Sequence, residues 1–243
     1  MAYGDAHAAW YDALYDALGK APEAEAADLL AVATAELGRP PTSWLDVACG
    51  TGRHLATVAD TVDDVVGVDL SPQMLDVART RLSGRVALHV ADQRELDLGR
   101  TFDVVTSLFS SIGYARDLDE LDRTVAALAA HVAPGGLLLL EPWVDPSDWQ
   151  DGLTQVVDVE DGGRRAVRML TSRREGDVSV LDAAIVSAAA GRLTVDREEH
   201  RMLLVPHARL LASVRATGLQ AEDHPGPGPA GRGLVLARRA VAS

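Results

Sequence analysis

Short, continuous apolar runs alternate with helix-like segments over the first 140 residues, and this alternation restricts the fold more than any other feature. The apolar runs lie at residues 44–48, 64–70, 85–90, 102–108 and 137–140. Such runs are typical of strands buried on both faces, which occur where helices cover both sides of a parallel sheet. We therefore predict an α/β fold with a doubly wound, mostly parallel sheet and right-handed crossovers.

The pattern changes after Pro146. Four further strand-like segments follow, at residues 156–159, 166–170, 178–186 and 192–204. Turn signals separate them at Gly162-Gly163 and Gly176-Asp177, which indicates an antiparallel meander. A helix at 206–216 and a strand at 234–238 then resume the first pattern. We expect residues 1–145 and 205–243 to form one Rossmann-like domain, and 146–204 to form an antiparallel β lid over the substrate site.

Charge and cysteine content limit the partners. The 243 residues contain 36 Asp and Glu against 23 Lys and Arg, a net charge of −13. So acidic a chain repels phosphate backbones, and we predict neither nucleic acid nor a membrane as a partner. Cys49 is the single cysteine, so no internal disulfide can form, which suits the reducing cytoplasm. We expect no signal peptide, no membrane span and no metal, because no segment has the required composition or ligand spacing.

A glycine-rich turn follows the first apolar run, in the order Asp46-Val47-Ala48-Cys49-Gly50-Thr51-Gly52. Such a turn lets a ligand approach the backbone at the start of a helix. A dinucleotide-binding turn needs a third glycine, and Leu55 stands at that position. Asp46 would also repel a pyrophosphate. The turn is better suited to a cationic ligand, such as the amino-acid end of S-adenosylmethionine (SAM).

Acidic residues also end the next two runs. Asp69 lies at the end of the second run and could accept hydrogen bonds from two ribose hydroxyls. Asp92 follows the third run and could accept an adenine amino proton. The carboxyl ends of parallel strands share one edge of the sheet, where open α/β sheets bind ligands. The alternative is that each aspartate only caps the helix after it, and for Asp92 alone this alternative stays open.

These features together resemble the class I SAM-dependent methyltransferases, over residues 44–140 and the final helix–strand pair. The resemblance implies a seven-stranded Rossmann-like sheet, SAM as cofactor, and Gly50 and Gly52 beside its methionine part. Ala48 stands where many members carry glycine, and Cys49 is interpreted as a packing residue. The residues expected at the cofactor are Tyr11, Asp46, Ala48, Gly50, Thr51, Gly52, Asp69, Leu70, Met74, Asp92, Gln93 and Leu108.

Several segments resemble, more narrowly, the N-methyltransferases that dimethylate nucleotide-linked 3-amino-deoxyhexoses in antibiotic pathways. They are residues 45–54 (LDVACGTGRH), 109–113 (FSSIG), 141–143 (EPW), 174–176 (REG), 198–201 (EEHR) and 231–234 (GRGL). The segments span nearly the whole chain, lid included. This resemblance implies a thymidine-diphosphate aminosugar as substrate, held between lid and core, methylation of its amino group, and a homodimer.

The narrower resemblance also implies roles for single residues. Tyr3 would lie near the amine and Tyr11 near the SAM carboxylate. Glu141 and Trp143 would lie at the mouth of the substrate site, and Arg232 would bind the diphosphate through its paired donors. Tyr114 replaces a histidine of the family near the acceptor amine, so Tyr3 and Tyr114 are the candidate catalytic residues. His54 and His200 are interpreted as structural.

Three other interpretations stay open. The acceptor could be another small natural-product intermediate without a nucleotide, methylated on nitrogen or oxygen. The protein could bind SAM without catalysis, although the intact set of three aspartates and two glycines argues against that. An NAD-dependent oxidoreductase is disfavoured by Leu55 and Asp46.

Overall fold

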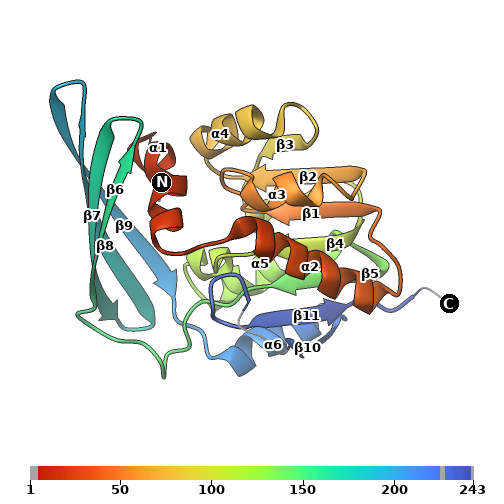
Figure 1. Cartoon of the computed structure of the whole chain (residues 1–243). Helices are drawn as coiled ribbons and strands as arrows, with labels where there is room; N and C mark the ends of the chain where they lie inside the picture. Colours follow the sequence, from red (N-terminus) through yellow and green to blue (C-terminus); the bar gives the residue numbers. More distant parts are fainter. Residues whose placement is uncertain (1–4, 225–227, 242–243) are drawn as a thin grey trace.

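The computed structural model describes residues 5–224 and 228–241 (Figure 1). Its elements in chain order are α1 (Asp5–Ala17), α2 (Pro22–Leu37), β1 (Ser43–Val47), α3 (Arg53–Val58), β2 (Asp64–Asp69), α4 (Pro72–Leu82), β3 (Ala87–Val90), β4 (Phe102–Ser107), α5 (Leu118–Ala130), β5 (Val132–Leu140), β6 (Thr154–Asp161), β7 (Arg164–Glu175), β8 (Val178–Ala189), β9 (Arg192–Leu203), α6 (His207–Ala216), β10 (Gln220–His224) and β11 (Leu234–Arg238). Two 3-10 turns, Gln93–Glu95 and Ser111–Tyr114, follow β3 and β4. None of the helices in this part of the chain is long and apolar enough to cross a membrane.

The central sheet has seven strands in the order β10-β11-β5-β4-β1-β2-β3. Neighbouring strands from β5 to β3 are parallel, and β11 runs antiparallel to both of its neighbours. The predicted doubly wound, mostly parallel sheet is therefore confirmed. No apolar run predicts strand β10, because its sequence is QAEDH and only Ala221 is buried. An edge strand needs little apolar surface, which explains why the pattern did not reveal it.

Helices cover both faces of this sheet, as the continuous apolar strands require. Helices α2, α3 and α4 pack on one face, in a cluster that includes Leu29, Leu55 and Leu75. Helices α5 and α6 pack on the other face, in a cluster that includes Val125 and Val214. Side chains of β1, β2, β4 and β5 alternate between the two clusters, whereas the edge strand β3 is largely exposed.

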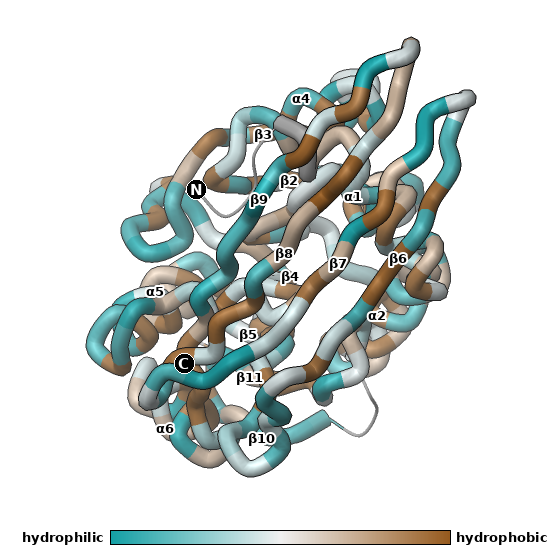
Figure 2. Tube along the Cα trace, turned by 90° about the vertical axis from the view of Figure 1, so that its left-hand side faces the viewer, coloured by the Kyte–Doolittle hydropathy of each residue, from teal (hydrophilic) through white to brown (hydrophobic). Residues whose placement is uncertain are grey.

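The second sheet is antiparallel, in the order β6-β7-β8-β9, and lies beside the central sheet (Figures 1 and 2). Its inner face packs on α1, where Trp10 and Leu14 join Val157 and Ile185 in a third apolar cluster. The opposite side of α1 is held to the core through Asp12, which pairs with Arg81 of α4 and accepts a hydrogen bond of 2.7 Å from Thr51. Helix α1 therefore connects the lid sheet to the core, a role that its sequence pattern did not indicate.

Candidate active site

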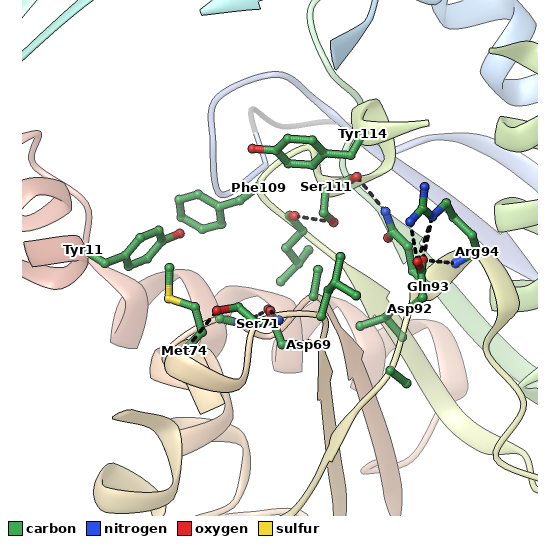
Figure 3. A pocket seen from close by; sticks show the side chains of 16 residues that line it. Tyr11, Asp69, Ser71, Met74, Asp92, Gln93, Arg94, Phe109, Ser111 and Tyr114 are labelled. Atoms are coloured by element: carbon green, nitrogen blue, oxygen red, sulfur yellow. Dashed lines mark hydrogen bonds and ion pairs between the residues drawn. The ribbon is translucent and has the colours of Figure 1, made fainter. Parts of the chain in front are cut away.

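A cavity of about 250 Å³ lies at the carboxyl ends of β1, β2, β3 and β4 (Figure 3). Tyr11 stands at one end, and Asp92 and Gln93 stand at the other. Asp69 and Tyr114 face the cavity from opposite sides. The predicted residues that line it are Tyr11, Ala48, Gly50, Asp69, Leu70, Met74, Asp92, Gln93, Leu108 and Tyr114. The structure thus brings most of the expected cofactor residues to one place.

The glycine-rich turn has the left-handed backbone that its composition suggests. Ala48, Gly50 and Gly52 all have positive φ, at 63°, 57° and 73°. A side chain built on Gly50 would meet no protein atom, whereas one built on Gly52 would lie 3.0 Å from Leu82 of α4 and 3.1 Å from Ala78. Gly52 does not line the cavity. Its structural task is to let α4 approach the turn, and a direct contact with the cofactor stays a prediction.

Asp69 ties the turn to the next helix. One carboxylate oxygen accepts from the Gly50 amide and the other from the Ser71 amide, each at 2.8 Å. Ser71 in turn caps α4 by accepting from the Met74 amide. Burial raises the pKa of Asp69 despite these hydrogen bonds. Each carboxylate oxygen has a further acceptor site, so Asp69 remains suited to ribose hydroxyls.

Asp92 has a strong partner within the chain. Its carboxylate accepts from the backbone and the guanidinium of Arg94, and this pairing lowers the pKa of Asp92. The capping alternative is therefore what the structure shows for Asp92, and its contact with adenine stays a prediction. Gln93 offers a second acceptor at this end of the cavity. Its amide nitrogen donates to the Ser111 carbonyl at 2.9 Å, and its buried Oε1 has no partner among the described residues.

Asp46 lies beneath the turn, beside a smaller cavity of about 50 Å³ that Tyr11, Ala48 and Gly50 also line. Its side chain is 3% exposed and accepts a hydrogen bond of 2.7 Å from the Thr106 hydroxyl. Burial raises the pKa of Asp46 to about 6. A buried acid next to a cavity is stabilised by a ligand cation, and an ammonium group would meet this need. Thr51, the remaining predicted cofactor residue, lines the same small cavity.

Tyr114 lies on the 3-10 turn after β4, and its side chain reaches the cavity. Its hydroxyl is 2.8 Å from His200 Nδ1, across a separation of 86 residues. His54 lines the smaller cavity beside Asp46, with its Nε2 3.0 Å from Glu25. The other catalytic candidate, Tyr3, lies outside the described residues.

The predicted substrate residues meet at the end of β5. Glu141 is fully buried, and its two oxygens accept from the amides of Phe109 and Ala230, which fastens the C-terminal loop to the loop after β4. Arg232 lies over the Trp143 ring, with its Cζ 4.4 Å from the ring centroid. Burial raises the pKa of Glu141 and lowers the pKa of Arg232. The Arg232 guanidinium makes no ion pair with any described residue.

Trp143 also reaches the lid. Its indole nitrogen donates to the Ser179 hydroxyl of β8 at 2.8 Å. The Arg232 guanidinium donates to the Ser110 hydroxyl at 3.2 Å. The predicted substrate residues therefore lie where the second sheet, the C-terminal loop and the core meet.

Comparisons with known proteins agree with this geometry. A family model described as a methyltransferase domain matches residues 45–136. The dTDP-3-amino-3,6-dideoxy-alpha-D-glucopyranose N,N-dimethyltransferase of Streptomyces fradiae is 40% identical over 92% of this chain and 87% of its own. The dTDP-3-amino-3,4,6-trideoxy-alpha-D-glucopyranose N,N-dimethyltransferase of Streptomyces venezuelae is 39% identical over 95% of this chain and 96% of its own.

The chain belongs to this family of class I, SAM-dependent methyltransferases. Two solved structures share its whole fold. Streptomyces venezuelae DesVI has a TM-score of 0.90 and 37% identity, over 96% of this chain and 98% of its own. The SAM-bound amino pentose methyltransferase CalS10 of Micromonospora echinaspora has a TM-score of 0.84 and 36% identity, over 95% and 96%.

The cavity of this methyltransferase fits SAM, its cofactor. The buried Asp46 carboxylate suits the cofactor's ammonium, Asp69 suits the ribose, and the polar side chains of Asp92 and Gln93 line the end expected for adenine. The open space beside Gly50 gives the methionine part room to lie against the backbone. Each end of the site therefore offers a donor or acceptor of the required kind.

Several site residues of this methyltransferase have no local signal in the sequence. Phe109 and Ser110 adopt positive φ, at 51° and 61°, and only the family resemblance had singled out their segment. Strain of this kind gathers at ligand sites in many proteins. The sequence did not indicate that the Arg94 guanidinium pairs with the Asp92 carboxylate, nor that His200 contacts Tyr114.

Proposed function

We propose that this protein transfers methyl groups to the amino group of a dTDP-linked aminosugar in natural-product biosynthesis. The observation that carries the proposal is the extent of the similarity to the dTDP-aminosugar N,N-dimethyltransferases, which spans 92% and 95% of the chain. It therefore includes the lid sheet, outside the methyltransferase domain match at 45–136. The cofactor fold is shared by enzymes with many acceptors, whereas a shared lid supports a shared substrate class.

Arg232 supports a diphosphate-bearing substrate. An acidic chain that binds an anion needs a local cation, and Arg232 is held in place by Trp143 and Ser110 without an ion pair to a described residue. A guanidinium presents paired donors that match phosphate oxygens. We infer that it binds the diphosphate at the junction of lid, C-terminal loop and core.

The reaction depends more on aligning the acceptor amine with the methyl group than on activating either reactant. SAM supplies an activated methyl group when bound, so the protein must place the acceptor amine behind it and exclude water. We assign the exclusion of water to residues 146–204, the lid, with α1 beneath it. Tyr3 and Tyr114 are proposed to position the amine, Tyr11 the cofactor carboxylate, and Glu141 and Trp143 the sugar.

We further propose that the protein is a homodimer that works in the cytoplasm. Hydrophobic residues lie on all four strands of the lid sheet (Figure 2), and five of them are exposed. They are Val156, Met169, Val186, Leu193 and Val195, which are 37–68% exposed. An exposed apolar patch of this kind is typical of a contact surface, and a second copy would cover it symmetrically. The buried free thiol of Cys49 suits a reducing compartment.

Calorimetry tests the substrate class. We expect S-adenosylhomocysteine to bind, and dTDP to bind in its presence. Binding of the first alone would leave the methyltransferase intact and exclude the nucleotide-linked acceptor. With a dTDP-aminosugar, mass spectrometry of the product gives the number of methyl groups.

Arg232→Ala tests the diphosphate contact. Loss of a charged, paired contact should raise the Michaelis constant of the dTDP-sugar about 10- to 100-fold, without changing S-adenosylhomocysteine affinity. Arg123→Ala, an exposed arginine on α5, is the matched control. Unchanged substrate constants in Arg232→Ala would show that the diphosphate lies elsewhere.

A further inference from the structure

A chain of three polar side chains leads from the cavity into the lid. Tyr114 lines the cavity, its hydroxyl is 2.8 Å from His200 Nδ1, and His200 Nε2 is 3.4 Å from the Glu198 carboxylate. His200 and Glu198 both lie on the inner face of β9. Their side chains are only 5% and 7% exposed. A buried histidine between a carboxylate and a hydroxyl is the arrangement by which proteins hold one imidazole tautomer.

The contacts decide where the protons reside. The contact between Glu198 and His200 Nε2 does not have hydrogen-bond geometry, but the negative charge 3.4 Å away favours a proton on Nε2. We infer that Nδ1 then presents a lone pair and accepts from the Tyr114 hydroxyl. A phenol that donates in this way can still accept through its oxygen. Tyr114 lines the cavity, and Figure 3 shows its ring above Phe109 and Ser111.

We propose that His200, backed by Glu198, removes the acceptor's ammonium proton through the Tyr114 hydroxyl. The inference rests on the proposed function, because it requires an amine acceptor. An aliphatic ammonium has no lone pair at neutral pH and must lose a proton before it can attack. Tyr114 faces the cavity, so it is the candidate catalytic residue of the three. His200 and Glu198 act through it and are positioning residues.

The proton balance is simple. An N–H proton of the ammonium passes to the Tyr114 oxygen while the Tyr114 proton passes to His200 Nδ1, which frees the nitrogen lone pair and leaves an imidazolium. The Glu198 carboxylate offsets that charge. The N–CH₃ bond then forms as the S–CH₃ bond breaks, and the imidazolium releases its proton to solvent after turnover. No oxidant, reductant or further reactant is needed.

The surroundings of the imidazole favour this role. Leu181 of β8 lies opposite His200 in the sheet, and Asp182 beside it points to the outer face, where it pairs with Arg173. Tyr114 from the 3-10 turn and Glu198 from β9 are titratable groups that contact the ring. The buried Arg168 lies on the inner face of β7, and it and Glu198 both act electrostatically on Tyr15. The nearby Arg116 is largely exposed and pairs with Glu120.

His200→Asn separates proton transfer from simple orientation. The asparagine oxygen replaces Nδ1 as an acceptor for Tyr114 but cannot take a proton. General base catalysis contributes about 10²- to 10⁴-fold, so kcat at pH 7 should fall at least about 100-fold with little change in the Michaelis constants. Activity should then rise about tenfold per pH unit toward the amine's own pKa, because solvent removes the proton instead.

Two further variants and a control complete the test. Tyr114→Phe should give the same loss and pH profile, and the double variant should be no worse than either single one. If His200→Asn fails to fold, the half-buried Tyr114 carries the test alone. Glu198→Gln should lose about tenfold, whereas Glu199→Gln, its neighbour on the outer face, should keep wild-type turnover.

The outcomes separate the two proposals. Wild-type protein that methylates no dTDP-aminosugar overturns the proposed function and this inference with it. Active wild-type protein alongside a His200→Asn variant with wild-type kcat and pH profile overturns this inference alone. A uniform loss at every pH, or additive effects in the double variant, would likewise show that His200 only supports the lid.

Discussion

Replacing Asp46 with asparagine should make the protein more stable and worse at binding its cofactor. Asp46 is 3% exposed, and burial raises the pKa of its carboxyl from 3.8 to about 6. Because the folded pKa lies above the unfolded one, the folded state binds the proton more tightly. The stabilising contribution of this group is therefore complete below about pH 4 and is lost as pH rises through about 6.

The pKa difference sets the magnitude. A rise of about two pH units corresponds to about 3 kcal/mol of unfolding free energy lost above pH 7. Asp46→Asn removes the ionisation and keeps an acceptor for Thr106, but its amide hydrogens need a partner. We therefore expect the unfolding free energy to rise by about 1–3 kcal/mol at pH 8, and by much less at pH 4.

Cofactor affinity should change in the opposite direction. Loss of the carboxylate leaves the ligand ammonium without its counter-charge, which should weaken S-adenosylhomocysteine binding about 10- to 100-fold. In the wild type, affinity should fall as pH drops below about 6, because protonation neutralises Asp46. Urea unfolding at pH 4 and pH 8 and calorimetry measure the two effects.

Asp103→Asn is the matched control. The hydrogen bond from Arg39 holds the pKa of Asp103 below its usual range, so its contribution is present at neutral pH and is lost as pH falls through the folded value. Asp103→Asn should therefore destabilise the protein at pH 8, opposite in sign to Asp46→Asn. An Asp46→Asn protein that is less stable than wild type at pH 8, or that binds S-adenosylhomocysteine equally well, would refute the reasoning.

Three shorter predictions concern the turn, the ribose site and the lid. Gly52→Ala should destabilise the protein by about 1–3 kcal/mol in urea unfolding, because its Cβ would press on Leu82 at a positive φ, and unchanged stability would disprove the close contact. Asp69→Ala should weaken S-adenosylhomocysteine binding about 10- to 100-fold by calorimetry, and equal affinity would mean that the ribose lies elsewhere. Val195→Glu should give a monomer in sedimentation velocity if the lid face joins two copies, and a monomeric wild type would contradict the dimer.

The sequence alone predicted six of the seven strands of the central sheet and the sheet edge at which the cavity lies. Burial on both faces leaves a local record, a continuous apolar run, and parallel strands necessarily end at one edge. Asp46 and Asp69 could therefore be predicted to lie near one another from positions 23 residues apart in the chain. Strand β10 escaped because an edge strand with a single buried residue leaves no such record.

Contacts between distant segments needed the tertiary structure. Nothing near Tyr114 in the chain indicates His200, and nothing in α1 indicates that one side packs on the lid while Asp12 on the other side pairs with Arg81. Gly52 likewise has a clear turn signature, but only the approach of α4 shows what excludes a side chain there. Periodicity and turn composition indicate whether each residue is buried and which backbone conformation it adopts. Which two side chains meet depends on how whole elements pack, and residue spacing along the chain carries no record of that.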